Sequence, residues 1–157
     1  FAMAQRGVFA IPDPDTEADL FEATQELFER AGLPAYEISN HARLGAECRH
    51  NLVYWRYGDY IGIGPGAHGR LTNADGATGL ATAAHKKPEA WLEAAAGPDP
   101  LALAETTVLS RSERIEEMAM LGLRLTTGIA RADIERIAGK PLEETLDKRY
   151  QIGRAHV

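Results

Sequence analysis

The segment 16–39 constrains the fold most, because an amphipathic helix is followed at once by a tight turn and a strand. Thr16 and Asp19 form an approximate capping box at the helix start. Mostly apolar residues recur at steps of three and four, namely Leu20, Ala23, Thr24, Leu27, Phe28 and Ala31. Gly32 and Pro34 end the helix, and Ala35–Ser39 follows as a strand. This order predicts an α/β fold with a parallel sheet.

The rest of the chain alternates between strands and helices. We expect a loop over 40–57 with one helical turn around Asn51–Trp55, and a strand over Tyr60–Gly64. A hairpin of 68–72 with 78–85 should turn around Asp75-Gly76. Further helices are expected over Pro88–Ala96 and from the Ser110/Glu113 capping box onwards. Arg131–Ala138 forms another, with Ile134 and Ile137 facing inward, and 142–150 starts the last. The predicted domains are 1–97 and 110–151, joined by a linker over 98–109 that begins Pro98-Asp99-Pro100.

Composition excludes several classes of protein. Hydrophobic residues make up 45% of the chain and charged residues 25%, which is ordinary globular usage. With no apolar run that could span a bilayer and no signal peptide, we expect a cytoplasmic location without membrane association. The net charge of −6, without a dense basic block, argues against nucleic acid as a partner. One cysteine, Cys48, allows neither an internal disulfide partner nor an iron–sulfur cluster built from this chain.

Both ends of the sequence look truncated. Phe1–Arg6 reads as the last turn of a helix closed by Gly7. Residues 152–157 match the translation of a common sequencing-adapter read-through, so we set this tail aside in predicting the fold.

Most of the reactive side chains gather in Glu47–Tyr57 and in the glycine-rich segment 62–68 that follows. An imidazole can ligate iron, aromatic rings can stack on a macrocycle, and guanidinium groups can pair with propionates. The combination of His50, Tyr54, Trp55 and flanking arginines therefore suits a large, flat, anionic ligand such as a porphyrin.

Plainer interpretations exist for each of these residues. His50 can be a hydrogen-bonded loop residue, and Tyr54 and Trp55 can anchor the loop in a core. His41, Cys48 and His50 lack paired CxxC spacing and give only a weak zinc signal. Gly62, Gly64 and Gly66 are not followed by GK[ST], so a close backbone approach to a ligand or a strand explains them better than phosphate binding.

Taken together, the strings YEISNHA, ECRHNLVYWRYGDYIGIGPGAHGRL and SRSERIEEMAMLGLRLTTGI resemble the HemW family of radical-SAM heme chaperones. The resemblance runs from about residue 12 into the helical region after Ser110, and His50, Asn51, Tyr54 and Trp55 meet the family pattern H-N-x-x-Y-W. It implies the end of a partial (β/α) radical-SAM barrel with accessory strands over 1–97. A small, helical, winged-helix-like C-terminal domain, truncated here, begins at 110–151.

The resemblance also implies heme as ligand, an apo-hemoprotein as recipient, and a [4Fe–4S] cluster with S-adenosyl-L-methionine in the full-length proteins. The family's CxxxCxxC cluster loop is absent, so we expect the chain by itself to be inactive. The heme contact maps onto His50, with Asn51, Tyr54 and Trp55 completing the set, while Gly62, Gly64 and Gly66 lie near the cofactor side.

Two alternatives stay open. One is an oxygen-independent coproporphyrinogen III oxidase of porphyrin biosynthesis, the activity of the sister family. The other is a non-catalytic α/β scaffold with a structural His–aromatic loop.

Overall fold

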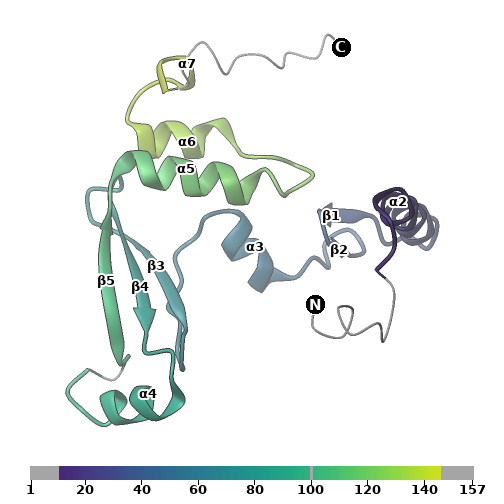
Figure 1. Cartoon of the computed structure of the whole chain (residues 1–157). Helices are drawn as coiled ribbons and strands as arrows, with labels where there is room; N and C mark the ends of the chain where they lie inside the picture. Colours follow the sequence, from purple (N-terminus) through teal and green to yellow (C-terminus); the bar gives the residue numbers. More distant parts are fainter. Residues whose placement is uncertain (1–10, 100, 146–157) are drawn as a thin grey trace. The chain divides into compact units, whose positions relative to one another are not determined.

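A computed structural model describes residues 11–99 and 101–145 of the chain. It divides into two compact units, one up to Cys48 and the other from Arg49 onwards. Figure 1 labels their helices and strands. Each unit is described by itself. The expected helical turn over 1–6 and the expected adapter-derived tail over 152–157 lie outside the described residues.

The first unit begins with the long helix α2, Pro14–Arg30. The predicted capping box at Thr16 is wrong, because the cap is Asp13. One carboxylate oxygen of Asp13 accepts hydrogen bonds from the backbone N–H groups of Asp15 and Thr16 at 3.1 and 3.0 Å. These bonds hold the pKa of Asp13 below its ordinary value. Pro14, which lacks an N–H group, fits the first helical position, so the helix begins three residues earlier than the pattern predicted.

After Gly32, which has a φ of 73°, the chain forms the small hairpin of β1 (Ala35–Glu37) and β2 (Asn40–His41). The two strands are antiparallel. The expected parallel pairing of 35–39 is therefore not formed within the described residues, because the chain turns back at once on this strand. The fully buried Glu37 fixes that turn, since its carboxylate accepts hydrogen bonds from Ser39 N–H and the Asn40 side chain.

The second unit contains a three-stranded antiparallel sheet in the order β3 (His68–Thr72), β4 (Gly79–Ala84) and β5 (Leu103–Leu109). The predicted hairpin is confirmed, with His68 opposite Ala83 and Thr72 opposite Gly79. Its turn is closed by Asp75, whose carboxylate accepts the N–H groups of Ala77 and Thr78, each at 2.9 Å.

Two stretches of this unit differ from expectation. Tyr60–Gly64 is not a strand: only Tyr60 pairs, through a single bridge to Arg70 on β3. Residues 103–109, expected as part of a linker, form the strand β5 along β4. Alternation of apolar and polar residues is weak in Leu-Ala-Glu-Thr-Thr-Val-Leu, and five of its seven residues are exposed, so pairing with β4 decides its structure.

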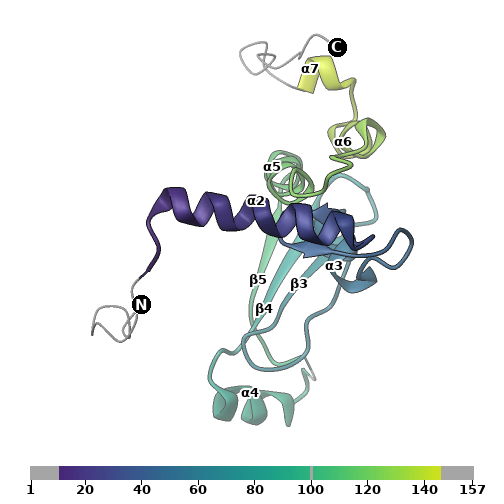
Figure 2. The same ribbon diagram turned by 90° about the vertical axis from the view of Figure 1, so that its right-hand side faces the viewer.

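Helices complete the second unit: α3 (Arg49–Trp55), α4 (Pro88–Ala95), α5 (Arg111–Gly122), α6 (Arg131–Ala138) and α7 (Leu142–Thr145). The capping box at Ser110 and Glu113 is confirmed, as are the bounds of α6 and its end at Gly139 in the left-handed region. In Figures 1 and 2, α5 and α6 lie at one end of the sheet and α4 at the other.

The core of the second unit lies where α5 and α6 meet. Met118 and Ile137 are fully buried there, 2% and 0% exposed, while Ile134 is half-buried. The described residues thus form a mixed α/β structure of six helices and two small antiparallel sheets. No helix among them is long and apolar enough to cross a membrane.

Candidate functional site

The short helix α3 carries the polar and aromatic residues that the sequence singled out. His50 and Tyr54 stand four residues apart, one turn of the helix, so their side chains meet on one face. The Tyr54 hydroxyl lies 3.1 Å from His50 Nε2, and the rings meet edge to face with centroids 4.8 Å apart. His50 is exposed and Tyr54 is half-buried. The imidazole therefore faces solvent while Tyr54 orients it.

Tyr54 is itself held from the other side. Its ring packs edge to face on Tyr60, with centroids 4.5 Å apart. Tyr60 is fixed by its backbone bridge to Arg70, at 2.8 and 2.9 Å. A relay of two aromatic rings thus links His50 to the first strand of the sheet.

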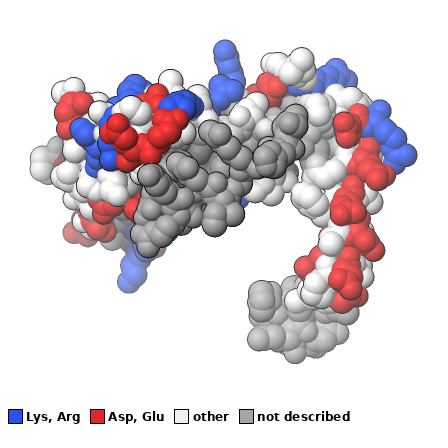
Figure 3. All heavy atoms as spheres, turned by 90° about the horizontal axis from the view of Figure 1, so that it is seen from above, with Lys and Arg blue, Asp and Glu red and all other residues white. Residues whose placement is uncertain are grey.

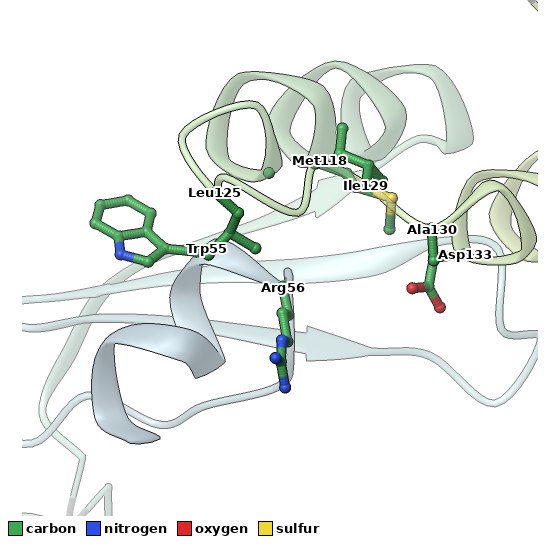
Figure 4. Close-up of a pocket in the computed structure, with 9 residues that line it drawn as sticks. Trp55, Arg56, Met118, Leu125, Ile129, Ala130 and Asp133 are labelled. Atoms are coloured by element: carbon green, nitrogen blue, oxygen red, sulfur yellow. The ribbon is translucent and has the colours of Figure 1, made fainter. Parts of the chain in front are cut away.

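Asn51 and Trp55 occupy a different face of α3, and both are half-buried. The Trp55 ring lies under the guanidinium of Arg124, with Cζ 4.6 Å from the ring centroid. Trp55 also lines a small cavity of about 30 Å³ with residues of α5 and of the segment leading into α6. Figure 4 shows its side chain at the end of α3 beside Leu125, with Met118 and Ile129 further along the cavity.

The three candidate glycines, Gly62, Gly64 and Gly66, lie where the backbone has little space or a positive φ. A Cβ on Gly62 would lie 2.1 Å from the carbonyl oxygen of His68, so only glycine fits beside β3 at this point. Gly64 and Gly66 have φ of 115° and 70°, and Gly66 N–H donates to the carbonyl of His85 at 2.8 Å. The expected close backbone approach is thus found at Gly62, and the neighbour is a strand.

A polar cluster that the sequence did not indicate is formed by Tyr57, Arg70 and Glu117, just after the end of α3. Glu117 of α5 accepts two hydrogen bonds from Arg70 at 3.0 and 2.9 Å and one from the Tyr57 hydroxyl at 2.8 Å. The Arg70 hydrogen bonds hold the pKa of Glu117 below its usual value. Burial, with Glu117 as hydrogen-bond partner, raises the pKa of Tyr57 to about 12. The chain segment after α3, the strand β3 and the helix α5 are therefore joined through one carboxylate.

Arg114, also on α5, is only 3% exposed. Its guanidinium donates to the carbonyls of Gly76 and Thr78 at 3.1 and 3.0 Å and to the Thr72 hydroxyl at 2.8 Å. It thereby ties α5 to the turn of the β3–β4 hairpin. Sequence reasoning missed Arg114 and Glu117 because charged residues on an amphipathic helix are ordinarily assigned to solvent.

Metal binding by side chains finds no support in the described part of the chain, where no group of three or more His, Cys, Asp or Glu residues could hold an ion. His41 of the weak zinc trio is engaged elsewhere in the first unit. Its Nε2 lies 3.0 Å from Gln25 Oε1, and its ring stacks on Phe28 at 4.5 Å.

Comparison with known proteins shows the family of this chain. The HemN C-terminal domain family matches residues 109–156. The heme chaperone HemW of Escherichia coli (strain K12) is 38% identical over 124 residues, covering 72% of this chain and 32% of that protein. The chain belongs to the HemW-like family.

Two further relatives also match most of this chain. The mitochondrial radical S-adenosyl methionine domain-containing protein 1 of Bos taurus is 36% identical over 135 residues, 82% of this chain and 29% of that protein. The heme chaperone HemW of Bacillus subtilis (strain 168) is 33% identical over 143 residues, 91% of this chain and 36% of that protein. This HemW-like chain thus spans about a third of the curated relatives it matches. No solved structure matches it.

Two groups that the family implies differ in their fit to this HemW-like chain. The chain has a single cysteine, so its residues do not fit a [4Fe–4S] cluster, which needs several thiolates. Heme fits better, because an exposed imidazole stands on α3 with two aromatic rings behind it and the exposed Arg49 and Arg56 at the ends of the helix. The match to residues 109–156 includes most of the expected adapter-derived tail, whose origin stays a prediction.

Proposed function

We propose that this chain contributes the heme-binding segment of a heme chaperone, which delivers heme to an apo-hemoprotein. The observation that carries the proposal is the His50–Tyr54 pair, presented to solvent on α3 and backed by Tyr60. Two of the curated relatives described above are named heme chaperones, which supports heme as the cargo.

The chemistry of the cargo matches this helix. Iron takes an imidazole nitrogen as an axial ligand, and His50 is the exposed imidazole of the motif. Binding through Nε2 would require the Tyr54 hydroxyl to move, whereas binding through Nδ1 would leave the pair in place. Arg49 and Arg56, both exposed, are suited to pairing with propionates.

The remaining predictions about the whole protein rest on the family. We propose that the full-length protein holds a [4Fe–4S] cluster and S-adenosyl-L-methionine on a partial (β/α) barrel, and that 110–151 begins a winged-helix-like domain. Reading the genomic sequence upstream for a CxxxCxxC motif tests this. The cytoplasmic location stays a prediction, because the name of the Bos taurus relative assigns that protein to mitochondria.

A titration of the chain with heme tests the proposal. We expect His50→Ala to weaken binding about tenfold or more and to change the Soret band of the bound form, because the axial ligand is lost. His68→Ala is the matched control, since His68 is an exposed histidine of the same unit outside α3. An unchanged affinity and spectrum in His50→Ala would remove His50 as a ligand and favour a structural loop.

The oxidase alternative is tested separately on the full-length protein. Release of carbon dioxide from coproporphyrinogen III, under anaerobic conditions with a reductant, would favour the biosynthetic enzyme over the chaperone.

A further inference from the structure

The His50–Trp55 motif on α3 has two faces with different surroundings in this structure. His50 and Tyr54 pair with each other on one face. Trp55 follows Tyr54 directly, and a step of one residue turns a helix by about 100°. Its side chain consequently contacts the segment that follows α5 instead of lying beside His50.

Trp55 packs where α3 meets the end of α5 and the segment after it, a contact that we call the joint. The Arg124 guanidinium covers its ring at 4.6 Å. Trp55 also shares the lining of the small cavity with Leu125, 7% exposed, and the fully buried Met118. The indole nitrogen is buried without a hydrogen-bond partner within the described residues. Aromatic rings contribute to packing through the large area that they bury, and Trp55 packs here although its N–H group has no partner, so its role at this position is that of an anchor.

The backbone of α5 also approaches α3 at this point. A Cβ on Gly122 would lie 2.5 Å from Cγ1 of Ile129 and 3.5 Å from the carbonyl oxygen of Trp55. Gly122, at the end of α5, therefore admits the Ile129 side chain and the end of α3 together. All of these contacts come from residues inside the match to the HemN C-terminal domain, except Trp55 itself.

We infer that Trp55 is a positioning residue, which fixes α3 on the HemN C-terminal region and so sets how His50 is presented to heme. This inference rests on the proposed function and reassigns Trp55, expected as a heme contact, to the joint behind it. Loosening the joint reduces the fraction of chains in which His50 is correctly placed, and the apparent affinity falls by that fraction.

Heme titrations of Trp55→Ala, Trp55→Phe and Arg124→Met test the inference. We expect Trp55→Ala to weaken binding about tenfold, Arg124→Met about threefold, and Trp55→Phe less than about twofold, because phenylalanine keeps a ring under the guanidinium. The Soret band of each saturated variant should coincide with that of the parent chain, since His50 still ligates the iron. Parental affinity in Trp55→Ala, a band moved as in His50→Ala, or no rescue by Trp55→Phe would overturn the assignment.

Hydrogen exchange without heme separates this inference from the proposed function. In Trp55→Ala and Arg124→Met, amides of α3 should exchange about tenfold faster while those of the β3–β4 hairpin stay unchanged, because only the joint opens. His50→Ala is the control and should leave α3 protected. Failure of the parent chain to bind heme would refute the function alone, whereas unchanged exchange of α3 in both variants would refute the joint.

Discussion

Single side chains of α5 organise the second unit. Glu117 receives hydrogen bonds from Arg70 and Tyr57, which come from two other segments. The Arg70 side chain is 27% exposed and that of Glu117 is 24% exposed, so water screens this pair less than it screens a surface ion pair. The bidentate geometry further favours the ionised carboxylate. Glu117 thus stabilises the contacts of α5 with β3 and with the segment that follows α3.

Glu117→Gln should lower the free energy of unfolding by about 1–2 kcal/mol at neutral pH, because an amide accepts less strongly from Arg70. The pKa of Glu117 is held below its ordinary 4.5 in the folded chain, so its contribution is present above that value. This contribution to stability is lost as the pH falls through the lowered pKa of Glu117. The free energy of unfolding of Glu117→Gln should not show this fall at acidic pH. Urea unfolding at several pH values measures both effects.

Glu116→Gln provides the matched control, since Glu116 is the exposed neighbour of Glu117 on the same helix. Its stability should stay within about 0.5 kcal/mol of the parent chain. Equal losses in the two variants would show that the hydrogen bonds of Glu117 contribute nothing specific.

At the scale of elements, α5 connects several parts of the second unit. It contacts α3, α6 and β5, and Arg114 ties it to the hairpin turn. Its start is fixed locally: the Glu113 carboxylate accepts from the N–H and hydroxyl groups of Ser110 at 2.8 and 2.7 Å. Such a helix transmits a change at its N-terminus to the elements packed against it.

Ser110→Ala should therefore cost about 1 kcal/mol of stability, the usual effect of losing an N-cap side chain. Thermal unfolding followed by circular dichroism measures it. Ser112→Ala, an exposed serine inside the same helix, should change stability little or raise it, because alanine has the higher helix propensity. A cap variant as stable as the parent chain would mean that tertiary contacts alone fix the start of α5.

At the scale of the whole molecule, the two units differ in how much they bury. The helix α2 has no buried residue, and acidic side chains run along it (Figure 3). Its apolar residues Leu20, Phe21 and Leu27 are 57%, 52% and 61% exposed. Apolar side chains so exposed along one helix favour association with a further surface.

We expect the chain to self-associate through this helix. Replacing Leu20 and Leu27 together by glutamine should remove most of the associated fraction, because the exposed apolar area falls while the charge is kept. Multi-angle light scattering after size-exclusion chromatography measures the mass. A double change of Glu22 and Glu29 to glutamine is the control and should not reduce association. A parent chain that is monomeric and melts in one sharp transition would contradict the expectation.

The sequence alone determined the elements whose signals are local. The capping box at Ser110, the bounds of α6 and the hairpin turn at Asp75-Gly76 follow from contacts between residues a few positions apart. The pairing of His50 with Tyr54 was not predicted, because the expected helical turn did not include His50, although one turn of the observed helix α3 separates the two residues.

Tertiary structure decided what depends on distant partners. Residues 103–109 became a strand because β4 offered an edge, and 60–64 stayed irregular because only Tyr60 reached β3. Trp55 could be assigned to a joint, and Glu117 to a hydrogen-bonded cluster, only once residues 47 or more positions away lay beside them. Side-chain type and spacing carry no record of such partners, so only the folded chain reveals them.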